Sequence, residues 1–227
     1  MPGPAVQLSD VSKTYHEGDS ERIVLRDVSV TIAPGEIAVL VGRSGSGKST
    51  LLNLIAGIDR PTAGRVRVDG IDLTALDEDA RTRFRRSRIG FVFQFFNLVP
   101  VLNAEENMLL PLSIAGRKPE RVWVEQLMRT VGIDDRRTHR PSELSGGQQQ
   151  RVAVARALVS RPAVIFADEP TGNLDSATST EVLQLLRRAV DEFGESVVMV
   201  THDEHAASFA DRRIELVDGL VVRDEAT

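Results

Sequence analysis

The segment Gly42–Thr50, with the sequence GRSGSGKST, combines glycines, a lysine and hydroxyl side chains in an order suited to phosphate chemistry. It fits the pattern G-x-x-x-x-G-K-[ST], in which glycines let the backbone curl so that successive N–H groups point at a phosphate. In that pattern Lys48 reaches the β- and γ-phosphates of a nucleoside triphosphate, and the Ser49 hydroxyl binds Mg²⁺. The segment therefore predicts a nucleoside triphosphate site.

The elements expected on either side of this segment match what such a loop requires. Residues 37–41 (IAVLV) form a short apolar, β-branched run typical of a buried strand, and residues 49–56 (STLLNLIA) place apolar side chains at helical spacing. The positive N-terminal end of that helix would add to the attraction for phosphate. An ordinary glycine-rich turn is the alternative, but it does not account for the lysine and the hydroxyl. The loop alone leaves a GTPase, a small-molecule kinase and a motor protein open.

A pair of acids follows a second apolar run. Residues 164–169 (VIFADE) are typical of a strand that ends in Asp168 and Glu169. Carboxylates at the carboxyl end of a parallel strand lie in the crevice where α/β folds bind ligands. We expect Asp168 to hold Mg²⁺, directly or through water, and Glu169 to polarise the attacking water.

A second glycine-rich turn, 144–148 (LSGGQ), precedes a helix expected over residues 149–159. If the turn is only a helix start, Ser145 is its N-cap and the glycines allow a tight backbone. We expect that interpretation to explain Ser145 but not the paired glycines together with Gln148. One triphosphate does not need two anion-binding turns, so a further role is expected for this one.

The composition is that of a soluble globular protein with one domain. The chain has 227 residues, of which 41% are hydrophobic and 27% charged. A net charge of −5 argues against a general nucleic-acid binder, and the absence of cysteine excludes disulfides and thiolate metal sites. We expect no secretory signal, and no apolar stretch approaches the roughly 20 residues that cross a bilayer. Any connection to a membrane is expected to come through a partner.

Alternating strands and helices indicate an α/β fold with a mostly parallel sheet. Residues 6–32 show the period-two apolarity of strands, and the pattern over residues 97–160 is helical, which we interpret as an insert. Further elements are expected as follows: a strand near 66–68, a helix over 77–88, a strand over 89–93, helices over 104–110, 119–131 and 178–193, a strand over 196–200, and a closing hairpin over 214–222.

The order of these motifs resembles that of the ATP-binding cassette (ABC) family, in particular the nucleotide-binding subunit of an ABC transporter. The resemblance covers about residues 5–225 and rests on the phosphate loop, Gln94, the signature LSGGQ, Asp168-Glu169, the segment 173–175 (NLD) and Thr201-His202. It implies a P-loop NTPase with a RecA-like, mostly parallel sheet core, an antiparallel β subdomain and an inserted α-helical subdomain. Residues 5–96 and 161–225 would form the catalytic core with the β subdomain, and residues 97–160 the helical subdomain with the signature.

The same resemblance implies a role for each site residue. ATP contacts are expected from Tyr15, whose ring would stack on adenine, and from Gly42, Arg43, Ser44, Gly45, Ser46, Gly47, Lys48, Ser49 and Thr50. A second copy of the chain, in a head-to-tail dimer, would cap this ATP with Ser145, Gly146, Gly147, Gln148 and Asp175. Catalysis would rely on Glu169, His202, Lys48 and Gln94, and Mg²⁺ would be held by Ser49, Gln94 and Asp168. Structural alternatives stay open for three of these: a core aromatic for Tyr15, a polar strand-end residue for Gln94 and a structural histidine for His202.

Residues 89–94 (IGFVFQ), 96–100 (FNLVP) and 169–176 (EPTGNLDS) are similar to the macrolide-exporter and lipoprotein-release branch of this family, which we call MacB/LolD-like. The resemblance implies a permease with four transmembrane helices and a large extracytoplasmic domain. Arg43 and Val101 stand where proline and threonine are common, and neither change removes a catalytic group. The apolar segment 95–102 is expected to pack in the core, with a partly exposed groove for a permease coupling helix as the alternative.

The resemblance as a whole implies the ATP-binding subunit of a bacterial ABC transporter, which hydrolyses Mg-ATP to drive a separate MacB/FtsX-like permease at the cytoplasmic face of the cell membrane. No nucleic-acid partner is expected. The main alternative is the same ATPase in a cell-division or cell-wall-regulating mechanotransmission complex. A non-transport ABC ATPase in DNA repair or translation is less favoured, because the chain shows no coiled-coil insertion, zinc cysteines or second cassette. A small-molecule P-loop kinase would not explain LSGGQ.

Overall fold

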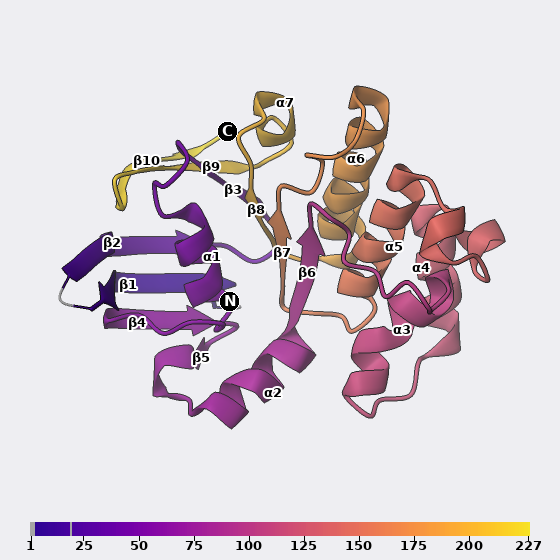
Figure 1. Cartoon of the computed structure of the whole chain (residues 1–227), viewed down its shortest axis with the longest axis horizontal. Coiled ribbons are helices and arrows are strands. Elements are labelled where there is room, and N and C mark those ends of the chain that lie inside the picture. Colours follow the sequence, from indigo (N-terminus) through magenta and orange to yellow (C-terminus); the bar gives the residue numbers. More distant parts are fainter. Residues whose placement is uncertain (1–2, 19) are drawn as a thin grey trace.

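The computed structural model describes residues 3–18 and 20–227, which form two sheets with helices around them (Figure 1). The smaller sheet is antiparallel with the strand order β2-β1-β4-β5, and the larger has the order β10-β9-β3-β8-β7-β6. The strands of the smaller sheet are β1 (Val6–Glu17), β2 (Ser20–Ile32), β4 (Ala63–Val68) and β5 (Ile71–Asp72). Those of the larger sheet are β3 (Ile37–Val41), β6 (Ile89–Phe93), β7 (Val164–Asp168), β8 (Val197–Val200), β9 (Arg212–Val217) and β10 (Leu220–Ala226).

The central strands of the larger sheet, β3, β7 and β8, are buried on both faces. β3 pairs in parallel with β8 and β9, and β7 pairs in parallel with β6 and β8, while β10 is antiparallel to β9. In β3, Val39 faces one hydrophobic core and Leu40 faces the other, and β7 and β8 alternate in the same way. This two-sided burial explains why these strands are continuous apolar runs. The parallel pairing also brings the carboxyl ends of β3, β7 and β8 to one edge.

Helices cover the two faces unequally. The helices are α1 (Lys48–Ile55), α2 (Glu78–Arg88), α3 (Ala104–Ile114), α4 (Arg121–Val131), α5 (Gly146–Leu158), α6 (Ser176–Phe193) and α7 (Glu204–Ala207), with short 3₁₀ turns at Leu73–Ala75, Asp134–Arg136 and Pro141–Glu143. Figure 1 shows α3 to α6 gathered on one side of the larger sheet, and α1 with the smaller sheet on the other. In the described part of the chain, no helix has the length and apolar character needed to span a membrane.

Local capping sets several helix boundaries. At the start of α3, the Asn103 side chain accepts a hydrogen bond from the N–H of Glu106, and the Glu106 carboxylate accepts one from the N–H of Asn103, both at 2.8 Å. α4 and α6 end at Gly132 and Gly194, whose φ values are +67° and +70°. Glycine is favoured at such C-terminal positions because it has no Cβ to clash in the left-handed conformation.

The fold class expected from the sequence is confirmed, with differences in detail. β1 and β2, within residues 6–17 and 20–32, pair as a hairpin, and α3 to α5 form the helical region. α3 continues to Ile114 instead of stopping at Leu110, because Pro111 lies near its end and its carbonyl still accepts a hydrogen bond from Ala115 N (3.1 Å). α7 and β5 were not expected, since elements this short show no periodicity. The subdomain boundaries at residues 96/97 and 160/161 stay predictions.

Glu195 is a buried carboxyl between α6 and β8. It is 7% exposed, and its side chain has no hydrogen-bond partner among the described residues. Burial raises its pKa from the ordinary value of 4.5 to about 8, although the positive charge of Arg161 opposes the shift. The folded state therefore holds this proton more tightly than the unfolded chain does. As a result, the contribution of Glu195 to stability is fully present below pH 4.5 and is lost as pH rises to about 8.

Replacing Glu195 with glutamine is therefore expected to raise the free energy of unfolding at pH 8 by roughly 1–3 kcal/mol, because a buried amide has no proton to lose. Below pH 4.5 the variant and the wild type should differ little. Urea unfolding at both pH values measures the effect. Glu192→Gln is a suitable control, because that carboxylate is 46% exposed and pairs with Arg188 on the surface. An unchanged pH dependence in Glu195→Gln would show that Glu195 is ionised in the folded protein.

Candidate functional site

A cavity of about 480 Å³ opens at the carboxyl edge of the larger sheet. It lies between the loop that joins β3 to α1, the ends of β7 and β8, and the β1-β2 hairpin. Its lining consists of Tyr15, Arg22, Val24, Gly42, Ser44, Gly45, Gly47, Lys48, Ser49, Thr50, Asp168, Glu169, Val200 and His202. The tertiary structure thus brings together the phosphate loop, the strand-end acids, Tyr15 and His202, which are far apart in the sequence.

Two glycines of the loop have no room for a side chain. Gly42 has a φ of +150°, and a Cβ added there would lie 2.3 Å from the carbonyl oxygen of Leu216 in β9. Gly47 has a φ of +106°, and a Cβ added there would lie 2.8 Å from Cδ2 of Leu25 in β2. The loop therefore needs glycine for its backbone conformation and for its close packing between two strands.

Lys48 is the first residue of α1, and its ammonium group is held across the loop. Nζ donates hydrogen bonds to the carbonyl oxygens of Gly42 (2.8 Å) and Arg43 (2.9 Å). Its positive charge adds to that of the helix N-terminus at the cavity, where both favour an anion. Arg43 and Ser46, two of the predicted ATP contacts, are not among the residues that line the cavity.

Asp168 ends β7 and lines the same cavity as Ser49. Burial and the negative charge of Glu169 raise the pKa of Asp168, and the positive charge of Lys48 opposes them. Within the described residues, no cluster of three or more His, Cys, Asp or Glu side chains could hold a metal alone. One carboxylate and one hydroxyl nevertheless suit Mg²⁺, which keeps several waters and completes its shell with substrate phosphates. The oxygen donors of Ser49 and Asp168 therefore fit this ion.

Glu169 combines an unusual backbone with a directed carboxylate. Its φ is +46°, a left-handed value that is uncommon for a residue with a side chain, and its N–H donates to the carbonyl oxygen of Val200 (2.9 Å). The carboxylate accepts a hydrogen bond from the Thr201 hydroxyl (3.3 Å) and lies 2.7 Å from Nδ1 of His202. The His202 side chain is 78% exposed, so it is not a core histidine. A left-handed backbone is strained for a residue with a side chain, and it persists only where surrounding contacts maintain it. At Glu169 this strained backbone occurs in a residue that lines the cavity.

Tyr15 forms part of the cavity wall, and the β1-β2 hairpin adds residues that the sequence did not indicate. Tyr15 pairs with Arg22 in the hairpin register, which places Arg22 and Val24 beside it in the lining. The Tyr15 hydroxyl donates a hydrogen bond to Oδ2 of Asp59 (2.9 Å). Burial and the Asp59 carboxylate raise the pKa of Tyr15. Neither Arg22 nor Asp59 belongs to a recognisable sequence motif. Strand register places Arg22 beside Tyr15, and tertiary packing places Asp59 beside the Tyr15 hydroxyl.

Gln94 contacts a loop outside the cavity. Its Nε2 donates to Oδ1 of Asn173 (3.3 Å), and Nδ2 of Asn173 donates to the carbonyl oxygen of Gln94 (3.0 Å). A Cβ on Gly172 would lie 2.8 Å from Nε2 of Gln94, so the amide packs closely on this loop. The structure therefore places Gln94 next to the segment that follows Glu169 and not among the residues that line the cavity.

The LSGGQ turn begins α5, and its local role is larger than the sequence suggested. Ser145 Oγ accepts a hydrogen bond from the N–H of Gln148 (3.3 Å), and the Gln148 side chain accepts one from the N–H of Ser145 (2.9 Å), which together form a capping box. A Cβ on Gly147 would lie 2.3 Å from Cγ2 of Thr178 in α6. The expectation that a helix cap leaves Gln148 and the glycines unexplained is therefore wrong for Gln148 and Gly147.

Asp175 caps the neighbouring helix. Its carboxylate accepts hydrogen bonds from the N–H (3.0 Å) and the hydroxyl (2.7 Å) of Thr178, and these contacts lower the pKa of Asp175. Because Gly147 packs on Thr178, the starts of α5 and α6 lie against each other. Asp175 and the residues 145–148 are absent from the lining of the cavity. Apart from Arg43, Ser46 and Gln94, the predicted site residues thus fall into two groups, one at the cavity and one at these two helix starts.

Comparison with known proteins agrees with this geometry. A family model described as "ABC transporter" matches residues 25–172. The lipoprotein-releasing system ATP-binding protein LolD of Anaeromyxobacter dehalogenans is 50% identical over 224 residues, which cover 97% of this chain and 94% of that protein. The macrolide export ATP-binding/permease protein MacB of Syntrophobacter fumaroxidans is 46% identical over 220 residues, which cover 95% of this chain but 31% of that protein. The chain thus spans less than a third of the length of MacB.

Solved structures share the whole fold. The dimeric post-hydrolysis state of the ATP-binding cassette MJ0796, bound to ADP and phosphate, has a TM-score of 0.86 and 45% identity, and the match covers 97% of this chain and 98% of that one. CbiO1 from Clostridium perfringens, part of the ABC transporter complex cbiONQ, has a TM-score of 0.88 and 27% identity, with 99% and 89% covered. The chain therefore belongs to the ABC transporter family, as an ATP-hydrolysing ATP-binding subunit of the MacB/LolD-like branch.

Proposed function

We propose that two copies of this chain hydrolyse Mg-ATP in a head-to-tail dimer and so drive a separate MacB/FtsX-like permease at the cytoplasmic face of the cell membrane. The observation that carries the proposal is the separation of the two anion-binding turns. The loop Gly42–Thr50 lines the cavity, whereas the turn 145–148 does not contribute to it and Ser145 is exposed. A turn that does not reach the nucleotide of its own chain is available to a nucleotide bound by another copy.

Within one copy, the cavity supplies half of the hydrolytic site. Lys48 and the N-terminus of α1 stabilise the negative charge of the phosphates. Glu169 accepts the proton of the attacking water, and His202, whose Nδ1 lies 2.7 Å from the Glu169 carboxylate, orients that group from the exposed side. Ser49 and Asp168 would hold Mg²⁺, which would supply positive charge to offset the negative charge of the phosphates. Gln94 would have to leave its contact with Asn173 to reach that ion.

The second copy supplies the other half. The residues proposed to act across the dimer interface are Ser145, Gly146, Gly147, Gln148 and Asp175. The start of α5 presents unpaired N–H groups and a positive helix end to an anion, which suits a γ-phosphate. The contact between Gly147 and Thr178 keeps Asp175 beside that helix start. The dimeric structure of the cassette MJ0796 supports the dimer on which this arrangement rests.

A groove on another side of the molecule is the proposed permease contact. Its volume is about 510 Å³, and it combines apolar side chains with three arginines: Ile58, Ile89, Phe91, Phe93, Leu110, Pro111, Ile114, Arg85, Arg86 and Arg156. The apolar segment 95–102 is only partly buried. Leu98 packs against the core, whereas Phe95 and Val101 are 72% and 73% exposed. Apolar surface bordered by arginine suits a short amphipathic helix of the permease that carries acidic residues.

The dimer proposal predicts how hydrolysis depends on protein concentration. At low concentration, where the protein is monomeric, it should bind ATP and barely hydrolyse it, because each cavity lacks the second copy's helix start. The rate per subunit should rise steeply as the concentration approaches that at which dimers form. ATPase assays beside light scattering measure both quantities. Full turnover by a strictly monomeric preparation would contradict the proposal, and co-purification with a membrane protein of four predicted spans would support its permease part.

A further inference from the structure

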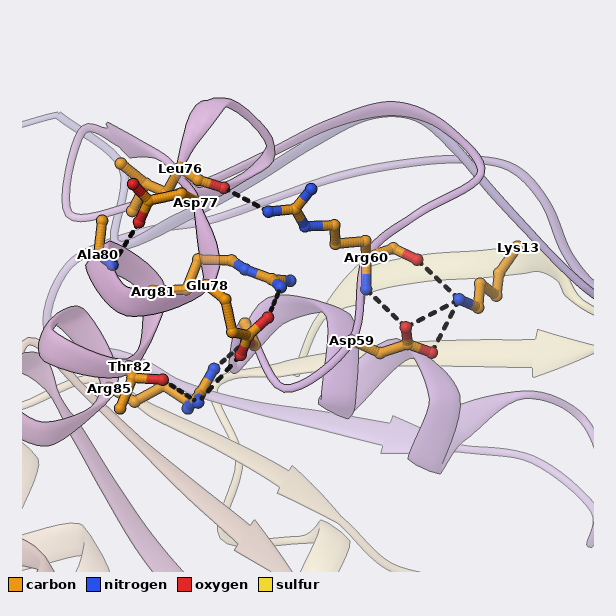
Figure 2. Close-up of polar contacts among 11 residues, drawn as sticks. Lys13, Asp59, Arg60, Leu76, Asp77, Glu78, Ala80, Arg81, Thr82 and Arg85 are labelled. Atoms are coloured by element: carbon orange, nitrogen blue, oxygen red, sulfur yellow. Dashed lines mark hydrogen bonds and ion pairs between the residues drawn. The ribbon is translucent and has the colours of Figure 1, made fainter.

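Two charged side chains hold Tyr15 on the side away from the cavity. The Tyr15 hydroxyl donates to Oδ2 of Asp59 (2.9 Å), and Nζ of Lys13 lies 4.6 Å from the centre of the tyrosine ring. Lys13 Nζ also lies 2.8 Å from each carboxylate oxygen of Asp59 and donates to the carbonyl oxygen of Arg60 (2.8 Å). Figure 2 shows Lys13, Asp59 and Arg60 converging at this point. We call Lys13 and Asp59 the tyrosine clamp.

Asp59 is itself fixed to the region that follows α1. Its N–H donates to the carbonyl oxygen of Asn53 (3.2 Å), and its Oδ1 accepts a hydrogen bond from the N–H of Arg60 (2.7 Å). Burial would raise the pKa of Asp59, but hydrogen bonds from Lys13, Arg60 and Tyr15 outweigh it and lower the pKa. The carboxylate is therefore ionised at neutral pH, and it can hold the ammonium and the phenol at once.

Lys13 leaves one face of the ring available. The residue is 9% exposed, and its ammonium group makes a cation–π contact with the Tyr15 ring. Tyr15 lines the nucleotide cavity and Lys13 does not. The ring thus offers the cavity the face that the ammonium does not cover. A planar base can therefore stack on one face of the Tyr15 ring, and the contacts with Asp59 and Lys13 set the orientation of that ring.

We propose that Lys13 and Asp59 are positioning residues that orient Tyr15 for adenine before ATP binds; this inference rests on the proposed stacking role of Tyr15. A ring held at its hydroxyl and at one face has little rotamer freedom left to lose on binding. The clamp is also linked, through α1, to the loop expected to bind the phosphates. α1 begins at Lys48 in the phosphate loop, and Asp59 follows the end of the same helix. One helix therefore sets the separation between the base platform and the phosphate site.

Binding measurements with two ligands test the clamp. Asp59→Asn keeps the size of the side chain but removes the charge that strengthens its contacts with Lys13 and Tyr15, and it should raise the Kd for ATP about fivefold, which corresponds to a loss of about 1 kcal/mol. The Kd for inorganic tripolyphosphate, which has no base, should not change. Lys13→Met should weaken ATP binding similarly, and Lys13→Arg should retain most of the affinity. Asp77→Asn is the matched control, because Asp77 caps α2 through Ala80 N and asparagine caps helices equally well (Figure 2).

A spectroscopic readout reports the clamp directly. Tyr15 is the only tyrosine of the chain, so an alkaline titration followed by ultraviolet absorbance measures its pKa alone. Burial and Asp59 raise that pKa above 10.0, and Asp59→Asn should therefore lower it. Asp77→Asn should leave it unchanged. A folded Asp59→Asn variant should still titrate above 10.0, because burial is the largest cause of the raised pKa and remains, whereas the exposed phenol of an unfolded variant would titrate at the ordinary value.

Two results would overturn the clamp while leaving the ATPase assignment in place. One is an equal loss of affinity for ATP and tripolyphosphate in Asp59→Asn, which would mean that Asp59 supports the loop as a whole. The other is a lowered phenol pKa with unchanged ATP affinity, which would mean that the contact does not position the base. If the wild-type protein bound tripolyphosphate as tightly as ATP, the stacking role of Tyr15 would fail, and the clamp with it.

Discussion

Replacing Glu169 with glutamine is expected to lower the rate of ATP hydrolysis by about three orders of magnitude, the middle of the range for loss of a general base. The amide keeps the size of the side chain, so the Thr201 hydroxyl still has an oxygen to donate to, but the amide cannot take a proton from water. ATP binding should survive, because Lys48 and the loop glycines are untouched. The variant should therefore accumulate as an ATP-bound dimer, visible by size-exclusion chromatography with ATP.

A matched carboxylate nearby provides the control. Glu204 lies in α7, is 76% exposed and pairs with Arg213 on the surface. Glu204→Gln should hydrolyse ATP at the wild-type rate and should not accumulate as a dimer. Rapid hydrolysis by Glu169→Gln would remove Glu169 from the role of base. Loss of both hydrolysis and ATP binding would instead assign it to holding the loop region.

Mixing two inactive variants is expected to restore hydrolysis if each site is shared between two copies. Lys48→Ala removes the phosphate-binding cation from the loop. Gly146→Asp places a carboxylate at the start of α5, where it would repel a γ-phosphate from the other copy. A Cβ at Gly146 meets nothing closer than Cδ2 of Leu174 at 3.5 Å, and an acid in the first turn favours the helix. We therefore expect Gly146→Asp to fold and to be inactive alone.

In a mixed dimer, the intact loop of the Gly146→Asp copy faces the intact turn of the Lys48→Ala copy. One complete site results, and the ATPase activity of the mixture should exceed the sum of the two separate activities. Lys48→Ala mixed with Glu169→Gln is the control, because both changes lie in the same half of the site. That pair should show no recovery. Equal behaviour of the two mixtures, or full activity of Gly146→Asp alone, would exclude a site shared between copies.

Features that depend on neighbouring residues were predictable from the sequence. The strand, turn and helix around the phosphate loop were predictable because their signals are local: a buried β-branched run, glycines and apolar residues at helical spacing. Gly42 and Gly47 do have φ values that favour glycine. The strand ending in Asp168 was predictable for the same reason, since a short run buried on both faces is apolar throughout.

Features that join distant residues could not be predicted. The contact between Tyr15 and Asp59 spans 44 positions, and that between Gln94 and Asn173 spans 79. Neither leaves a periodic pattern in the chain, because each depends on which strands pair and how helices pack. The raised pKa of Glu195 is a further case, since a glutamate between a helix and a strand resembles any surface acid until its burial is known.

The sequence by itself determined the nucleotide chemistry and the family, because the motifs that carry them are short and their geometry is local. It also predicted two anion-binding turns in one chain. Only the tertiary structure decided that the loop Gly42–Thr50 lines a cavity with Asp168, Glu169 and His202 while the turn 145–148 lies outside it. The reason is the parallel sheet, which gathers the carboxyl ends of β3, β7 and β8 at one edge, whereas α5 packs against α6 elsewhere. That separation is not visible along the chain, and it supports the second copy that the family resemblance implied.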